Sequence, residues 1–422
     1  MKFKKHTLKN GLRIITVPMK DNPTVTVLVL VETGSKYENK KIKGLSHFLE
    51  HMCFKGTTRR PKAIDISKEL DNLGSQYNAF TGHEYTGYYA KSEARHFKQI
   101  LDIVSDIYLH STFPETEIEK EKGVIIEEIN LYNDRPDIRV HEILYRLLYG
   151  DTPAGWDIIG TKETVRNTKR PDFLSYQKDH YVASATTVIV AGNIKEREAL
   201  EAAKKAFAPI ETSRKKGKER VVEKQNKPQV KIEYKKTDQS HLVLGIRTFD
   251  VFDKRNPTLS VLSGILGGGM SSRLFQRLRE EMGTCYRVGS SSNYFTDHGF
   301  FEISAGVDNK RVIEVLKAIL IELRDLKTRK VDREELNKVK EYMIGNLNLE
   351  LESSDSLANF FGGQEIMKRK IEDSAEIAQK IRRVTAEDIK ILANQVFKDR
   401  HLNLALVGPF KNPKGFQSIF KF

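Results

Sequence analysis

Cysteine is nearly absent from this sequence, and long apolar runs are absent altogether. Only Cys53 and Cys285 occur among the 422 residues, far apart in the chain, so they form neither a paired metal motif nor a disulfide framework. We therefore expect two free thiols in a reducing, cytoplasmic compartment. The basic N-terminus has no apolar segment behind it, so we expect no signal peptide. No apolar run approaches the about 18 residues that a membrane span needs, and we expect no membrane partner.

Acidic residues are fewer than basic ones, which gives the chain a formal net charge of +14 at pH 7. Much of the excess sits in short clusters such as Arg214–Lys216 and Lys368–Lys370. Nucleic-acid binding is one interpretation of such a balance. No basic motif interleaved with aromatic residues and no nucleic-acid-binding fold signature accompanies these clusters. We therefore interpret them as a solvated basic surface and expect no nucleic-acid partner.

The chain repeats itself on either side of a polar, turn-rich segment. Residues 211–229 have the composition of a linker and separate residues 1–210 from residues 230–422. Each half opens with strand-like segments, continues through long amphipathic helices and closes on a buried strand that ends in glycine. The paired segments are Leu12–Val17 with Val230–Tyr234, Thr24–Val31 with His241–Ile246, Phe97–His110 with Val312–Leu326, and Thr187–Gly192 with Leu404–Gly408. This pattern predicts an α+β chain of two homologous domains, each a mainly antiparallel sheet covered on one face by helices.

One short helical segment of the first half carries the residues for metal chemistry. His47 and His51 are four positions apart and therefore project from one helix face, which Glu50 shares. This is the H-x-x-E-H pattern, the reverse of the commoner H-E-x-x-H zinc motif. The two imidazoles can grip one ion, and Glu50 can reach a water molecule on it. The matching positions of the second half are all glycine: Gly264, Gly267 and Gly268. We therefore expect metal chemistry in the first half only.

A catalytic zinc site needs a third protein ligand and one open position. Residues 119–131 have a helical pattern, and Glu121 and Glu128 within it lie seven positions apart on the same face. Spacing alone leaves either carboxylate as the ligand. His83 is a candidate fourth ligand, but catalysis needs the open position, so we expect His83 to be a surface or groove residue.

The run His47–Thr57, HFLEHMCFKGT, followed at a distance by Glu128, resembles the pitrilysin family. That family includes insulin-degrading enzyme, the mitochondrial processing peptidases and their bacterial homologues, and the resemblance extends over nearly the whole chain. It implies a half-length zinc peptidase of the bacterial type with one Zn²⁺ per chain. The implied zinc ligands are His47, His51 and Glu128. Glu121 would support the site from behind the ligands.

The resemblance also implies a mechanism and places for substrate. Zinc would lower the pKa of its bound water and polarise the scissile carbonyl, and Glu50 would pass the water's proton to the leaving amine. Asn78 and Ala79 map to the family's substrate-binding edge strand. Arg279 and Tyr286 map to a substrate-binding Arg–Tyr pair. Without the resemblance, these four residues would be interpreted as parts of an ordinary strand, a surface arginine and a core tyrosine.

The sequence thus predicts a zinc metalloendopeptidase that cleaves peptides or unfolded segments in a closed chamber. Because larger family members join four such domains, we expect this chain to pair, as a homodimer or with a family paralogue. Arg279 and Tyr286 would then serve the partner subunit's zinc. The alternatives are a catalytically silent family scaffold and a basic nucleic-acid-binding protein. An intact base beside the predicted metal ligands argues against a scaffold.

Overall fold

The computed structural model describes residues 2–421, and their contacts divide into two compact units. Unit 1 runs up to Ile129 and adds Asp157–Glu219 and Asn348–Glu372. Unit 2 consists of Asn130–Trp156, Arg220–Leu347 and the chain from Asp373 onward. Within residues 2–421, no helix combines the length and the apolar character required to cross a membrane.

Unit 1 is built on a six-stranded sheet, sheet 1, with the order β1-β2-β6-β3-β5-β4. Its strands are β1 (Lys4–Thr7), β2 (Arg13–Pro18), β3 (Thr24–Val31), β4 (Gln76–Thr81), β5 (Thr86–Glu93) and β6 (Thr186–Gly192). All neighbours pair antiparallel except β2 and β6, which are parallel. The central strands β3 and β6 are buried almost throughout, which explains their continuous rather than alternating apolar pattern.

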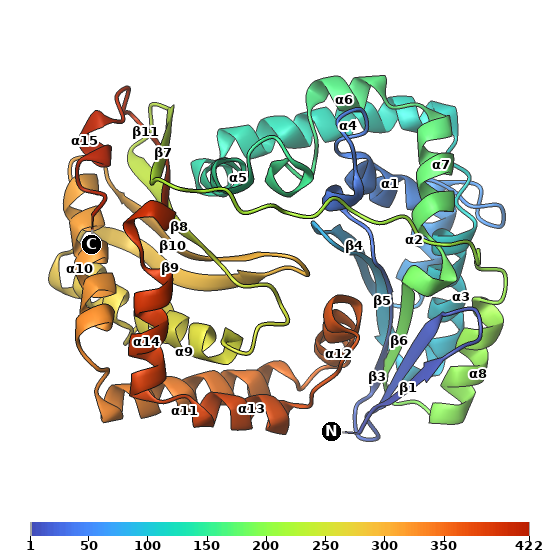
Figure 1. The fold of residues 1–422 in the computed structure, drawn as a ribbon. Coiled ribbons are helices and arrows are strands. Elements are labelled where there is room, and N and C mark those ends of the chain that lie inside the picture. The colour runs from blue at the N-terminus through green and yellow to red at the C-terminus, as the bar shows by residue number, and fades with distance from the viewer. Residues whose placement is uncertain (1, 422) are drawn as a thin grey trace. The chain divides into compact units, whose positions relative to one another are not determined.

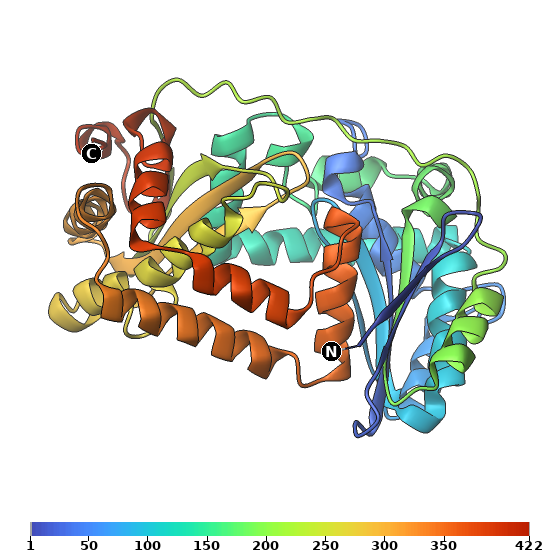
Figure 2. The ribbon, with the colours of Figure 1, turned by 60° about the horizontal axis from the view of Figure 1, so that its bottom comes forward.

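Helices cover both faces of sheet 1. The helices formed largely within unit 1 are α1 (Leu45–Cys53), α2 (Ala63–Asn72), α3 (Phe97–Leu109), α4 (Glu115–Asp134), α6 (Lys162–Asn167), α7 (Arg170–His180), α8 (Glu196–Ala206) and α12 (Ser354–Lys368). Both views place α3 and α8 on one face of the sheet and α12 along the other (Figures 1 and 2). Short 3-10 turns connect some of these elements: η1 (Ser35–Tyr37), η2 (Ala94–His96) and η4 (Ala183–Ala185).

Unit 2 contains a five-stranded sheet, sheet 2, with the order β7-β11-β8-β10-β9. Its strands are β7 (Gln229–Tyr234), β8 (Gln239–Thr248), β9 (Cys285–Tyr294), β10 (Gly299–Asp308) and β11 (Leu402–Gly408). Its helical elements are α5 (Pro136–Tyr149), η3 (Pro153–Gly155), α9 (Asn256–Gly267), the π-helix η5 (Phe275–Glu281), α10 (Val312–Thr328), α11 (Arg333–Glu350), α13 (Ser374–Arg383), α14 (Ala386–Val396), η6 (Asp399–His401) and α15 (Lys414–Gln417). Leu242 and Leu244 of β8 pack in the core with α9, α10 and α14, whereas Val243 between them packs with α5, as strand alternation requires.

The second face of each sheet is covered by a helix from the other half of the chain. Helix α12 packs on sheet 1, where an added Cβ on Gly362 would lie 2.8 Å from Leu30 Cδ1. Helix α5 packs on sheet 2, where an added Cβ on Gly245 would lie 2.5 Å from Leu144 Cδ1. Glycine at each crossing lets helix and sheet approach closely. The predicted α+β fold with two mainly antiparallel sheets is confirmed. The prediction placed helices on one face of each sheet, and the structure adds α12 on the second face of sheet 1 and α5 on the second face of sheet 2.

The predicted linker contains no helix or strand from residue 212 to residue 228, and Figure 2 shows this segment as an irregular trace between α8 and β7. The contact-defined units differ from the sequential division at residues 210 and 230 because α5 and α12 are exchanged. The division into domains 1–210 and 230–422 therefore remains a prediction that the two halves are homologous. It does not describe which segments pack together.

Adjacent glycines of α12 allow a test of its packing on sheet 1. We expect Gly362→Leu to lower the free energy of unfolding by about 1–3 kcal/mol, because the new side chain overpacks the contact with Leu30 and Ile189. Gly363→Leu is the control, since nothing lies within 4 Å of an added Cβ there, and it should stabilise by up to about 1 kcal/mol through helix propensity. Urea denaturation of both variants measures the difference. Equal stabilities would contradict the close packing of α12.

Candidate metal centre

The N-terminus of α1 is fixed by a buried carboxylate. Glu38 Oε2 accepts a hydrogen bond from the backbone N–H of Gly44, and Oε1 accepts one from that of Ser46, both at 2.7 Å. These are donors that a helix cannot satisfy internally. Gly44 has φ +88°, and a Cβ there would lie 2.4 Å from the carbonyl oxygen of Ile159, so only glycine allows this entry into the helix.

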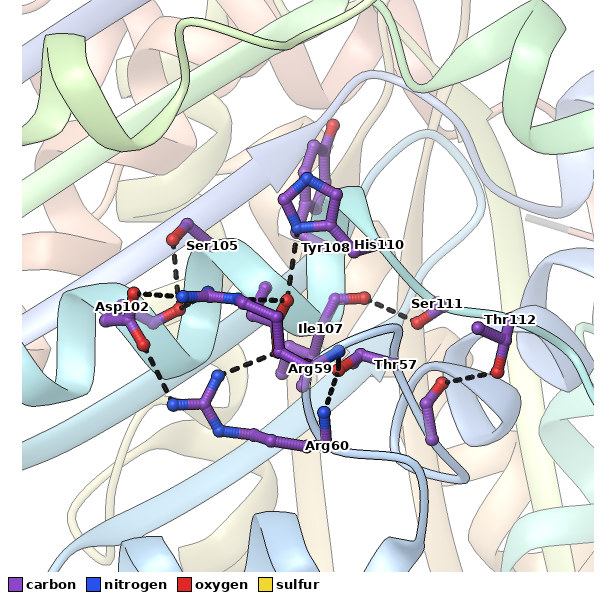
Figure 3. Close-up of polar contacts among 12 residues, drawn as sticks. Thr57, Arg59, Arg60, Asp102, Ser105, Ile107, Tyr108, His110, Ser111 and Thr112 are labelled. Atoms are coloured by element: carbon purple, nitrogen blue, oxygen red, sulfur yellow. Dashed lines mark hydrogen bonds and ion pairs between the residues drawn. The ribbon is translucent and has the colours of Figure 1, made fainter.

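The segment that follows α1 is tied to α3 by a buried ionic network (Figure 3). Thr57 Oγ1 and Arg60 Nη1 each donate to Asp106 Oδ2 at 2.7 Å, and Arg59 Nε donates to Asp106 Oδ1 at 3.0 Å. Burial alone would raise the pKa of Asp106, but these donors outweigh it and hold the pKa below its ordinary value. A buried carboxylate is tolerated only with such partners. Helix α1 is therefore held beyond both of its ends.

Three predicted ligands come together at the junction of α1 and α4. His47 Nε2 and His51 Nε2 each lie 3.7 Å from Glu128 Oε2, and the two imidazole ring centres are 4.6 Å apart. The ligand atoms of all three residues lie within 4.8 Å of one another, and no other group of this kind occurs among residues 2–421. All three side chains are partly exposed, which leaves access for a substrate.

Glu121, the other carboxylate that spacing allowed as a ligand, lies behind His51. Its Oε1 accepts a hydrogen bond from His51 Nδ1 at 2.9 Å, and its Oε2 lies 2.6 Å from Lys55 Nζ. Burial alone would raise the pKa of Glu121, but these two partners outweigh it and keep the carboxyl ionised. With Nδ1 of His51 engaged, Nε2 faces Glu128. Such an outer carboxylate orients a ligating imidazole and raises its basicity.

The charge state of the cluster fits a divalent cation. Burial, with the neighbouring His51, lowers the pKa of His47 to about 3, so the ring is neutral, which is the form that binds metals. Its Nδ1 is buried without a hydrogen-bond partner among the described residues. Burial would also lower the pKa of His51, but its hydrogen bond with Glu121 and the charges of Glu50 and Glu128 raise it. The imidazoles thus sit among carboxylates whose negative charge a cation would neutralise.

Glu50 lies on the same helix and makes a hydrogen bond with the edge of sheet 1. Thr81 Oγ1, at the end of β4, donates to Glu50 Oε2. Burial raises the pKa of Glu50 above its ordinary value, despite the opposing effects of Thr81 and His51. A carboxylate with a raised pKa accepts and returns protons better near neutral pH. Its position suits a general base beside a metal-activated water.

Asn78 and Ala79 lie on β4, the edge strand of sheet 1. The backbone N–H of Ala79 donates to Asn78 Oδ1 at 2.9 Å rather than to a neighbouring strand. No strand in the described part of the chain pairs with the outer side of β4. This edge can therefore accept an extended peptide. His83, beyond the end of β4, lies outside the ligand cluster, with Nδ1 3.0 Å from Ser35 Oγ.

Arg279 and Tyr286 belong to unit 2 and contact each other there. The Arg279 guanidinium lies 4.9 Å from the centre of the Tyr286 ring, and Nη1 donates to the Tyr286 carbonyl oxygen at 3.5 Å. Arg279 lies on the π-helix η5, a rare conformation that is frequent at functional sites. The Tyr286 side chain is 78% exposed. It is therefore not the core tyrosine of the alternative interpretation.

Sequence reasoning missed three residues that support the site: Glu38, Lys55 and Thr81. Lys55 carried only a partial signal: it follows His51 by four positions, but α1 ends at Cys53 and Lys55 lies just beyond the helix. Glu38 and Thr81 carried none, since each meets α1 only through the folding of a separate segment.

Two family models match the chain. The model described as "Insulinase (Peptidase family M16)" matches residues 13–162. The model described as "Peptidase M16 inactive domain" matches residues 167–343. The first match contains the His47, His51 and Glu128 cluster, and the second contains the glycines that replace the motif.

The relatives match over nearly the full length. A Bacillus subtilis protein named as an uncharacterised zinc protease is 38% identical over 97% of this chain and 99% of its own length. A Rickettsia felis protein with the same description is 35% identical over 95% of this chain and 96% of its own. The chain belongs to the M16 peptidase family, the insulinase family, which confirms the resemblance of the motif run.

Solved structures share the fold. The crystal structure of a protease from Helicobacter pylori aligns with a TM-score of 0.91 at 24% identity, covering 97% of this chain and 99% of that one. A Pseudomonas fluorescens structure described as a peptidase M16 inactive domain aligns with a TM-score of 0.90 at 17% identity and the same coverage.

Lys55 provides a test of how the cluster is supported. We expect Lys55→Met to weaken zinc binding about tenfold, because Glu121 loses the cation that keeps it an ionised acceptor for His51. Competition with a fluorescent chelator measures the affinity. Lys120→Met is the matched control. Lys120 lies next to Glu121 on α4, but its exposed side chain pairs with Glu117 at 2.6 Å instead. The support by Lys55 is refuted if both variants bind zinc like the wild type.

Proposed function

We propose that this chain is a zinc metalloendopeptidase that hydrolyses peptides or unfolded segments. One observation carries the proposal: the imidazoles of His47 and His51 and the Glu128 carboxylate come together, and the Glu50 carboxylate lies on the same helix as the two histidines. Two nitrogen donors and one oxygen donor, all on partly exposed side chains, are typical of a catalytic rather than a structural zinc site. Membership of the M16 family and the names of the relatives support the same assignment.

His47, His51 and Glu128 would hold one Zn²⁺ per chain. The neutral His47 and the orientation of His51 by Glu121 prepare both rings as ligands. Zinc bound there would supply Lewis acidity toward the scissile carbonyl and toward a water molecule. Glu121 holds His51 in place, and we assign it a supporting role rather than that of a ligand.

Glu50 is the proposed general base. Its carboxylate takes a proton from the attacking water and delivers that proton to the amine that leaves when the peptide bond breaks. The raised pKa of Glu50 suits both transfers. No side chain forms a covalent bond with the substrate in this scheme.

The substrate is proposed to lie extended along β4, where Asn78 and Ala79 offer backbone and amide hydrogen bonds. Arg279 and Tyr286 would bind the peptide and its developing oxyanion. We propose that two chains enclose the site, as a homodimer or with a family paralogue, in a cytoplasmic setting. A catalytically silent scaffold is the competing proposal, and it would bind zinc without cleaving peptides.

Glu50→Gln separates binding of the metal from chemistry. We expect the variant to lose at least about a hundredfold in kcat on a quenched peptide, because amide cannot accept the water's proton, while its zinc content equals that of the wild type. Glu127→Gln, on α4 and outside the ligand cluster, should retain activity. Metal analysis and cleavage before and after chelation are the measurements. A zinc-loaded wild type that cleaves no peptide would favour the scaffold.

Mixing two inactive chains tests whether Arg279 and Tyr286 serve the partner subunit. Dimers formed from equal amounts of Glu50→Gln and Tyr286→Phe chains should recover about a quarter of wild-type activity, because half of them are mixed and each mixed dimer has one intact site. The control replaces the second chain by one carrying both substitutions, which should stay inactive. Mixed dimers that form but remain inactive contradict the arrangement.

A further inference from the structure

The hydrogen bond from Thr81 to Glu50 joins the edge strand to the helix of the ligands. Thr81 is the last residue of β4 and pairs with Thr86 of β5. The two hydroxyls have different acceptors: Thr81 Oγ1 donates to Glu50 Oε2, whereas Thr86 Oγ1 donates to the backbone carbonyl of Thr33 at 2.9 Å. Thr81 is therefore the one of this pair that contacts the proposed base.

The turn that follows Thr81 is held firmly. The backbone N–H of Ser35 donates to the carbonyl oxygen of Gly82 at 3.2 Å. Glu84, only 3% exposed, has its Oε1 2.8 Å from both Lys36 Nζ and Lys218 Nζ. Removing one partner of a buried charge pair leaves the other charge buried without a partner, which is strongly destabilising. These contacts hold in place the segment that directly follows Thr81.

We propose that Thr81 is a positioning residue that sets the orientation of Glu50 relative to a peptide bound along β4. With Oε2 of Glu50 engaged by Thr81, Oε1 is the oxygen left to take the proton of the attacking water. The same strand carries Asn78 and Ala79 at the unpaired edge of sheet 1, where the peptide would bind. Base and substrate are then placed by one strand, which reduces the misalignment that costs rate. This inference rests on the proposed role of Glu50.

The test uses the zinc-loaded, full-length protein and three variants. Thr81→Val keeps the shape of the side chain but removes the donor, Thr81→Ser keeps the donor, and Thr86→Val removes a hydroxyl from the paired position. For Thr81→Val we expect kcat to fall about tenfold to a hundredfold with KM within about twofold of the wild type and unchanged zinc content. Thr81→Ser and Thr86→Val should keep kcat close to the wild-type value.

A wild-type kcat in Thr81→Val overturns the inference. So does a Thr81→Val variant in which only KM rises, or a Thr86→Val variant that loses as much kcat as Thr81→Val. Either of these last two results would show that Thr81 acts as an ordinary strand residue. Should Thr81→Val fail to fold, Thr81→Ala is judged by the same criteria. Glu50→Gln distinguishes the two failures. If it cleaves like the wild type, the proposed function fails and the inference with it. If it is inactive and Thr81→Val is fully active, only the inference fails.

Discussion

The Glu121 carboxylate joins the two helices on which the candidate metal centre depends. One oxygen accepts from His51 on α1, the other meets Lys55 just beyond α1, and the residue itself is part of α4. Because Glu128 lies two turns further along α4, this contact also sets the distance from Glu128 to both imidazoles. The candidate centre thus depends on an ionic contact between segments that are distant in the sequence, made by a residue that we propose is not itself a ligand.

The rest of unit 1 holds α1 still. The Glu38 carboxylate satisfies the first backbone donors of the helix, and the Asp106 network fixes the segment after it. On the opposite face of sheet 1, α12 brings the buried Glu365 to 3.0 Å from Lys5 and 3.4 Å from Arg13. The first unit is completed by α12, a helix encoded in the second half of the sequence. The half without the predicted ligands therefore contributes directly to the fold of the half that contains them.

Sequence reasoning predicted what is local or periodic. The helix spacing of His47, Glu50 and His51, the strand β3 at Thr24–Val31 and the paired organisation of the two halves all follow from short-range patterns. Spacing could not distinguish Glu121 from Glu128, because both lie on one face of α4, and only the approach of α1 makes them different. The exchanged helices and the Thr81 contact were not predictable, since each depends on which distant surfaces meet. The family resemblance supplied the ligand assignment that spacing left open.

Zinc-edge anomalous diffraction from crystals of the zinc-loaded protein would show which side chains bind the metal. We expect one strong peak per chain, about 2.0–2.2 Å from Nε2 of His47, Nε2 of His51 and a carboxylate oxygen of Glu128, with Glu121 still bonded to Nδ1 of His51. A peak coordinated by Glu121 instead of Glu128, or no ordered metal among these side chains at saturating zinc, would contradict this expectation.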